Sequence, residues 1–149
     1  MDAGAAIRGE GRVTAADNQK TARRIVLEVF NAGKAELFDS LFAADYVDHA
    51  LPPDVPSTPE GMRSMLTVLR GAFPDLAYTI DDQMGEGEKV ALRVTGRGTL
   101  QGEFMGMQPT GKTAIWQEMH WFRFNPEGEL AEHWDITDSL GMLSQLSAQ

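Results

Sequence analysis

The residues best suited to chemistry lie in one stretch, residues 118–138, which reads EMHWFRFNPEGELAEHWDITD. Two apolar runs separated by a glycine-containing turn are typical of a β-hairpin. This hairpin carries His120 and His133 together with two closely spaced acids, Asp135 and Asp138. A histidine beside a carboxylate can move a proton near neutral pH, so the hairpin is the first candidate for an acid–base site.

The register of the hairpin decides which of these side chains face one another. If the turn is the loop 126–129, His120 lies opposite Asp135 and on the same face of the sheet, whereas Asp138 lies opposite Gln117. In a dry cavity such a pair is coupled, because the carboxylate favours the charged ring while burial disfavours both charges. We therefore predict that His120 and Asp135 form the acid–base pair; the alternative is an ordinary polar pair that faces solvent.

Composition excludes several classes of partner. The chain has 149 residues, 22 acidic and 13 basic, with a formal charge of −9. A chain of this length usually forms one domain. Nucleic acids and anionic membranes are bound by clustered Lys and Arg, so the excess of acid predicts neither as a partner.

Signals for metal binding and for export are also missing from the sequence. There is no cysteine, and the three histidines, at 49, 120 and 133, lack a metal-ligand spacing such as HExxH. No apolar run reaches the roughly 18 residues of a membrane span. The first residues are small and polar, unlike a secretory signal. We predict a soluble cytoplasmic protein without a bound metal.

Hydrophobic spacing predicts helices in the first half of the chain and strands in the second. Asp17 or Asn18 is expected to cap the first helix, after a mobile tail at 1–14 and at the start of a domain at 15–149. Helices followed by hairpin-connected strands indicate an α+β fold. The predicted helices are 17–32, 34–43, 59–72 and 139–146, and the predicted strands are 76–81, 89–99, 113–124 and 129–136, with a short extended segment at 46–49.

Four further residues are candidates for contact with a ligand. His49 precedes a proline-rich loop and would either line a cavity mouth or lie on the surface. Trp116 and Trp134 would either floor a pocket for an aromatic ligand or belong to the core. Arg93 lies in an otherwise apolar strand, where it needs a partner if it points inward; an outward orientation is equally expected.

Several strings taken together resemble the SnoaL-like polyketide cyclase family of the NTF2-like, ketosteroid-isomerase-like superfamily. They are FPDL at 73–76, RVTGRGTLQGEFMGMQPTGK at 93–112 and FRFNPEGELAEHWDITDSLGMLSQL at 122–146. The resemblance implies an α+β cone, in which a curved antiparallel sheet and about three helices enclose a pocket. It also implies a hydrophobic, aromatic small-molecule substrate and neither a metal nor an organic cofactor.

The resemblance further implies a reaction. Family members of known activity close a ring of an anthracycline-type polyketide by an intramolecular aldol reaction, with an Asp as general acid/base. Asp135 matches that Asp and His120 matches its partner, while Phe30 and either Asp48 or His49 fall where the family lines its pocket. One departure is Leu100, where the family often has a histidine.

We therefore expect a cofactor-independent cyclase in which Asp135 moves the proton and His120 hydrogen-bonds Asp135 or the enolate. His49 and Trp116 or Trp134 would orient the substrate, and Asp138 is the reserve candidate for the acid. The alternatives are an isomerase, an epoxide hydrolase that would use Arg93, or a binding protein without catalysis. Apolar residues on the uncovered sheet face predict a homo-oligomer, a dimer or tetramer.

Overall fold

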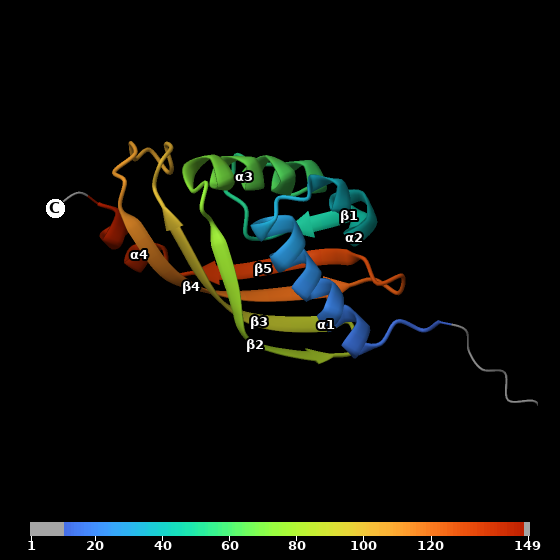
Figure 1. Ribbon diagram of the computed structural model, residues 1–149. Coiled ribbons are helices and arrows are strands. Elements are labelled where there is room, and N and C mark those ends of the chain that lie inside the picture. Colours follow the sequence, from blue (N-terminus) through green and yellow to red (C-terminus); the bar gives the residue numbers. More distant parts are fainter. Residues whose placement is uncertain (1–10, 148–149) are drawn as a thin grey trace, which may run out of the picture.

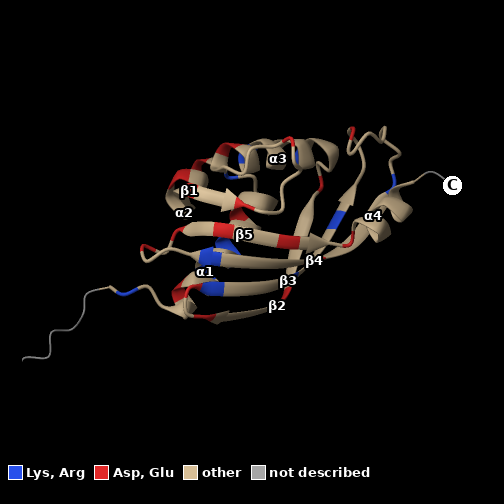
Figure 2. Cartoon of the chain, turned by 180° about the vertical axis from the view of Figure 1, so that it is seen from behind, with Lys and Arg blue, Asp and Glu red and all other residues tan. Residues whose placement is uncertain are grey.

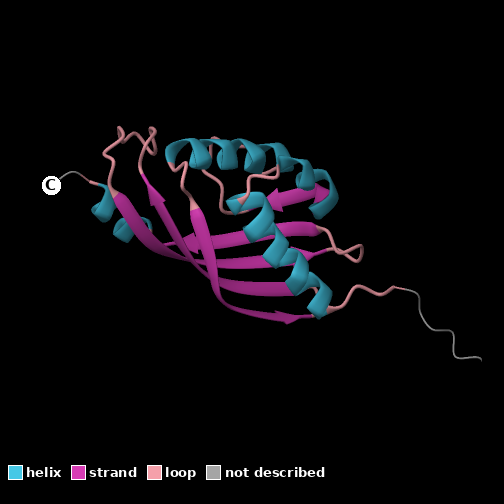
Figure 3. Cartoon of the chain, in the orientation of Figure 1, coloured by secondary structure: helices cyan, strands magenta, loops and turns pink. Residues whose placement is uncertain are grey.

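The computed structural model describes residues 11–147, and the tail predicted at 1–14 lies outside them except for its last four residues. Five strands form one curved sheet, with the helices α1 to α3 gathered on one side of it (Figures 1 and 3). The α+β prediction is confirmed. The elements are α1 (Ala15–Arg24), η1 (Ile25–Asn31), η2 (Ala35–Leu37), α2 (Phe38–Leu41), β1 (Phe42–Asp48), α3 (Pro59–Ala72), β2 (Ala77–Glu86), β3 (Lys89–Thr99), β4 (Thr113–Phe124), β5 (Leu130–Thr137) and α4 (Ser139–Leu146).

The strands follow the order β1-β5-β4-β3-β2 in the sheet. All neighbours are antiparallel except β1 and β5, which run parallel. The sequential pairing of β2 to β5 was predicted, but the sequence did not reveal that β1 adds to the far side of β5. This addition matters because it brings Asp48, at the end of β1, beside His133 of β5.

The first helix begins earlier than predicted. Its N-cap is Thr14, whose hydroxyl accepts from the backbone N–H of Asp17, while the Asp17 carboxylate accepts from the backbone N–H of Thr14. This reciprocal capping box satisfies two free donors, which a cap at Asp17 or Asn18 would not. The helix then widens into the π-helical segment η1, which ends before Gly33 in a left-handed conformation, φ 68°.

The second predicted helix, 34–43, is shorter than expected. It consists of the single turns η2 and α2, and the chain is already extended at Phe42. The third helix is confirmed: α3 covers Pro59–Ala72, with Thr58 as N-cap and proline in its first turn. Helix α1 packs on β2 and β3, and α3 packs on β1, so both close the concave side of the sheet over a shared apolar core.

The register of the β4–β5 hairpin is confirmed, although the turn differs from the predicted one. The loop is one residue shorter, since the backbone N–H of Asn125 donates to the carbonyl of Glu129. Between the pairs Phe124–Leu130 and Arg123–Glu132, β5 has one extra residue, which restores the register that the longer loop would have given. His120 therefore pairs with Asp135, as the longer loop had predicted.

Neither a large basic surface nor a membrane-spanning helix was predicted from the composition. Lys and Arg lie on several elements, among acidic residues (Figure 2). Within residues 11–147, no helix is long and apolar enough to cross a membrane.

Candidate acid–base site

The inner faces of β4 and β5 carry an unusual set of polar residues. Strand alternation places Glu118 and His120 of β4 on the same side as His133 and Asp135 of β5. Glu118, His120 and His133 are buried, with 7%, 4% and 2% of their surface exposed. Polar groups this deep in a sheet need partners, because burial without a hydrogen bond is costly.

These residues form the floor of a cavity of about 230 Å³. Asp48, at the end of β1, joins them. The walls are mostly apolar and come from η1, α3, α4 and two loops; they include Phe30, Met62, Met65, Leu69, Phe104 and Met142. An apolar cavity with a few convergent polar groups at one end is the usual form of a small-molecule site.

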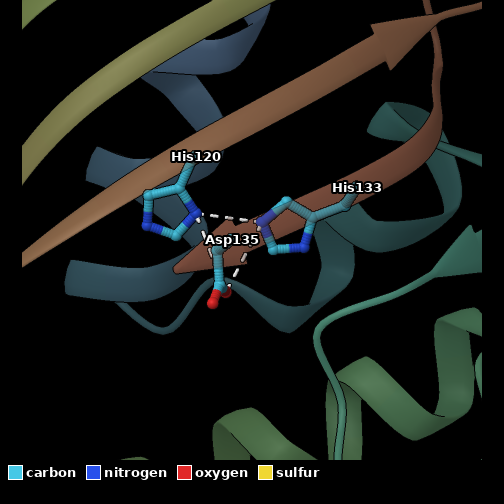
Figure 4. A group of neighbouring side chains, drawn as sticks. All are labelled: His120, His133 and Asp135. Atoms are coloured by element: carbon cyan, nitrogen blue, oxygen red, sulfur yellow. Dashed lines mark hydrogen bonds and ion pairs between the residues drawn. The ribbon is translucent and has the colours of Figure 1, made fainter. Parts of the chain in front are cut away.

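The four buried polar residues are joined in one chain of hydrogen bonds. Glu118 Oε2 lies 2.7 Å from His120 Nε2, and His120 Nδ1 lies 2.9 Å from His133 Nε2. His133 Nδ1 in turn lies 3.0 Å from Asp48 Oδ2. Two imidazoles are thus held between two carboxylates (His120 and His133 in Figure 4).

Further donors fix the carboxylate of Asp48. It accepts hydrogen bonds from the Tyr46 hydroxyl and, at 2.8 Å, from the backbone N–H of Ala50. Burial acts to raise the pKa of Asp48, but these donors and His133 outweigh it and hold that pKa below its usual value.

Glu118, at the other end of the chain, is held in the same way. The Trp116 indole donates to Glu118 Oε1 at 2.6 Å. Trp116 can reach this position because it lies across Gly96 of β3, where any Cβ would overlap the indole. Burial raises the pKa of Glu118, whereas hydrogen bonds from His120, Trp116 and Tyr78 lower it to a net value below normal.

Asp135 differs from the other two carboxylates. Its side chain is 24% exposed, and its Oδ2 lies 4.0 Å from His120 Nδ1 and 3.7 Å from His133 Nε2, beyond hydrogen-bond distance. No described residue donates a hydrogen bond to it. Burial raises the pKa of Asp135 above its usual value, and the two histidines oppose that shift only in part. Asp135 is therefore a carboxylate at the cavity floor with its lone pairs available to a substrate.

The same atoms raise the question of a metal ion. Among the described residues, His120, His133 and Asp135 place three ligand atoms within 4.8 Å of one another. The ring centres of the histidines are 5.2 Å apart and their planes differ by 10°, with 2.9 Å between the facing nitrogens. The rings therefore lie edge to edge, and the nitrogens point at each other. A shared metal requires both lone pairs to converge on a third point, so the arrangement fits a hydrogen bond better.

Several predicted ligand contacts lie away from the cavity. His49 and Trp134 stack on each other on the outer face of the sheet, with ring centres 4.7 Å apart, and His49 Nε2 lies 2.7 Å from Glu132. Arg93 also points outward, 3.8 Å from Asp81. Strand alternation explains these positions, because Trp134 and Arg93 each have the opposite orientation to the inward residues.

Of the remaining predicted residues, some line the cavity and others do not. Phe30 lines the cavity, as does Asp48, the other of the two residues proposed for that place. Trp116 is buried behind Glu118 and orients it rather than lining the cavity. Asp138 is exposed and caps α4, accepting at 2.9 Å from the backbone N–H of Gly141.

Sequence reasoning assigned no role to His133 or Glu118. Both stand two residues from a predicted site residue on the same strand, His133 before Asp135 and Glu118 before His120. Two polar residues at this spacing on a buried strand face would have been a usable signal. The position of Asp48 relative to His133 depends on the β1–β5 pairing, which no local pattern shows.

Comparison with known proteins gives a family match over most of the chain. The model of the family described as SnoaL-like polyketide cyclase matches residues 20–146. Among curated protein sequences, none matches this chain.

Solved structures with the same NTF2-like fold include three from Streptomyces. IdmH of Streptomyces antibioticus, provisionally described as a polyketide cyclase, is 33% identical with a TM-score of 0.77, covering 88% of this chain and 99% of its own. AclR of Streptomyces galilaeus, provisionally described as a hydroxylase, is 30% identical with a TM-score of 0.78, covering 89% and 82%. TsrD of Streptomyces laurentii is 28% identical with a TM-score of 0.80, covering 90% and 97%.

Proposed function

We propose that this chain, which belongs to the SnoaL-like polyketide cyclase family, is a cofactor-independent cyclase that closes a ring of an aromatic polyketide by an intramolecular aldol reaction. One observation carries the proposal: Asp135 lies at the floor of an apolar cavity, has a raised pKa and accepts no hydrogen bond from the described residues. A carboxyl group whose pKa is shifted upward toward the operating pH is a better general acid/base than an exposed one.

The proposed reaction needs only the groups at the cavity floor. Asp135 removes a proton from the substrate carbon between two carbonyls, and the resulting enolate carbon attacks a second carbonyl carbon of the same molecule. A carbon–carbon bond forms as the carbonyl π bond opens to an alkoxide, which takes the proton back from Asp135. Substrate and product contain the same atoms, so no co-reactant is consumed.

The histidines act differently from the expectation. His120 was expected to hydrogen-bond Asp135 or the enolate, but its nitrogens are engaged by His133 and Glu118. At 4.0 Å from Asp135 its influence is electrostatic. The apolar walls exclude water and fold the substrate, which supplies the part of the rate that one acid/base cannot.

The cavity volume bears on how a substrate sits in it. Sites for drug-sized ligands measure about 300–1,000 Å³, and this cavity measures about 230 Å³. We propose that the reacting end of the polyketide occupies the cavity while the rest extends toward solvent past Leu51 and Met105, which line the cavity and are themselves partly or largely exposed.

The epoxide hydrolase alternative loses its key residue. It required an arginine beside two acids to hold a water molecule, and Arg93 lies on the outer face, 47% exposed at its side chain. No arginine is among the described residues that line the cavity. The binding protein without catalysis is distinguished from the cyclase by experiment.

That experiment is the conservative substitution Asp135→Asn, assayed on an aromatic polyketide carrying a β-keto ester. We expect turnover to fall about 10²–10⁴-fold, the usual contribution of one general acid/base. Circular dichroism and ligand binding should be unchanged, which would show that the cavity is intact. Unchanged turnover, or wild-type protein that binds the substrate without converting it, would contradict the proposal.

We also propose a homo-oligomer formed through the outer face of the β4–β5 hairpin. Two cross-strand apolar pairs are exposed there, Met119 with Ile136 and Trp121 with Trp134. Clusters of this kind usually mark an interface. Light scattering should show the mass of a dimer or tetramer that Met119→Lys with Ile136→Lys reduces to a monomer; a monomeric wild type would contradict the proposal.

A further inference from the structure

We propose that His120 and His133 together carry three N–H protons, so that one proton is shared between them and the pair holds a single positive charge beside Asp135. In this arrangement His133, Asp48 and Glu118 are positioning residues, because they fix the charge that acts on Asp135. The role beside Asp135 rests on the function proposed above, whereas the proton count does not depend on it.

The count follows from the outer hydrogen bonds of the pair. The Glu118 and Asp48 carboxylates also accept from Trp116 and from Tyr46 and Ala50, and both have lowered pKa values, so they are ionised acceptors. His120 Nε2 and His133 Nδ1 must then each carry a proton to donate to them.

The inner nitrogens require one proton more. A neutral imidazole has a single N–H, and the outer bonds already use the one on each ring. Two neutral rings would leave the lone pairs of His120 Nδ1 and His133 Nε2 facing each other at 2.9 Å. The edge-to-edge alignment of the rings, visible in Figure 4, makes this contact repulsive without a proton and a linear N–H···N hydrogen bond with one.

The surroundings can support this charge. A buried imidazolium alone is unfavourable, but here a carboxylate is hydrogen-bonded at each end of the pair. The four groups together carry one net negative charge. The other titratable groups near them are Asp135 and two tyrosine hydroxyls. Burial raises the pKa values of Tyr46 and Tyr78, so both hydroxyls stay neutral.

The shared charge lies close enough to act on Asp135 without exchanging a proton directly. The separations of 3.7 Å and 4.0 Å exceed a hydrogen bond but leave a strong Coulomb interaction in a cavity of low dielectric. This attraction favours the ionised Asp135 against burial, so that the group can act first as a base and then return the proton as an acid.

The test is a long-range ¹H–¹⁵N correlation spectrum of the folded full-length chain labelled in histidine, at pH 7. We expect one bridging proton coupled to both His120 Nδ1 and His133 Nε2, with both outer nitrogens fully protonated. Exposed His49 serves as the internal reference. Two rings with one protonated and one unprotonated nitrogen each would overturn the proposal.

Two variants test whether the carboxylates hold the shared proton. Glu118→Gln and Asp48→Asn each replace a carboxylate by an amide, which can donate a hydrogen bond as well as accept one. Each variant should therefore leave the pair with two N–H protons at pH 7, because the outer ring nitrogen beside the amide loses its proton and accepts from the amide. The control Glu132→Gln removes the carboxylate beside His49 and should leave the signal unchanged. Persistence of all three N–H protons in either network variant would contradict the charge balance. The spectrum needs no turnover, so its outcome is independent of the Asp135→Asn assay.

Discussion

The two faces of the β4–β5 hairpin carry the same kinds of residue in different environments. On the outer face, His49 pairs with Glu132, and the side chains of both are partly exposed, at 39% and 25%. On the inner face, His133 pairs with Asp48, at 3% and 0%. Adjacent positions of one strand, Glu132 and His133, thus belong to different environments because alternate side chains point to opposite faces.

Burial, not residue type, makes the inner histidine–carboxylate set suited to chemistry. Water screens the outer pair, and its partners can separate at little cost. The inner groups are shielded from bulk water by burial, so their charges are more strongly coupled and their positions are fixed. A histidine next to an acid in a sequence therefore indicates a site only together with the face on which it lies.

The largest expected difference between the faces is in stability. Asp48→Ala leaves the His133 and Tyr46 donors buried without an acceptor, and we expect it to lower the free energy of unfolding by about 3–5 kcal/mol. Glu132→Ala removes an outer carboxylate that also accepts from Arg123, and we expect a loss of only about 0.2–1 kcal/mol. Urea unfolding measures both, and similar losses would contradict the comparison.

A smaller effect of opposite sign is expected for Asp135. Its raised pKa means that the folded state binds the proton more tightly than the unfolded state, so its carboxylate weakens the fold as pH rises above 3.8. Asp135→Asn should therefore raise the free energy of unfolding by about 0.5–2 kcal/mol at neutral pH, as at other functional sites. The gain should disappear at acid pH, where both side chains are neutral. A gain that does not depend on pH would show another cause.

Asp48 and Glu118 should show the reverse dependence on pH. Their pKa values are lowered in the folded state, so the stability they provide is present above the unfolded values of 3.8 and 4.5 and is lost as pH falls below them. Asp48→Asn should therefore flatten the acid limb of the stability curve, whereas Glu132→Gln should change it less because its environment is more exposed. Thermal unfolding at a series of pH values measures these slopes.

The smallest effect is expected on the outer face, at His49. His49→Ala removes a stacking partner of Trp134 and one hydrogen bond to Glu132, with an expected loss of under about 1 kcal/mol. Because the ring lies away from the cavity, kcat/KM for cyclisation should remain within about twofold of the wild type, a change worth under 0.5 kcal/mol. A loss comparable to that of Asp135→Asn would place His49 in the reaction.

Much of this arrangement was accessible from the sequence. The helix at 59–72, the strands at 89–99 and 113–124, and the pairing of His120 with Asp135 all follow from local rules. The hairpin register was predicted correctly although the loop was not, because a shorter turn and an inserted residue in β5 compensate each other.

The parts that sequence reasoning missed depend on contacts between distant segments. Asp48 reaches His133 only because β1 joins β5 across a separation of 85 residues. The outward position of His49 follows from that pairing, and the outward position of Trp134 follows from the alternation of side chains along β5. The sequence alone left both orientations open. Glu118 was readable as a buried neighbour of His120, but a carboxylate on a strand is usually expected to face solvent.

Exchange of a carbon-bound proton reports whether Asp135 is the general base of the cavity. The probe is an aromatic β-keto ester that lacks a second carbonyl to attack, and NMR in D₂O follows deuterium uptake at the acidic carbon. The control Asp138→Asn carries the same change three residues away and retains a residue that caps α4 equally well. We predict enzyme-dependent exchange for the wild type and for Asp138→Asn, and about 10²–10⁴-fold slower exchange for Asp135→Asn. Equal exchange by the wild type and Asp135→Asn would contradict the account.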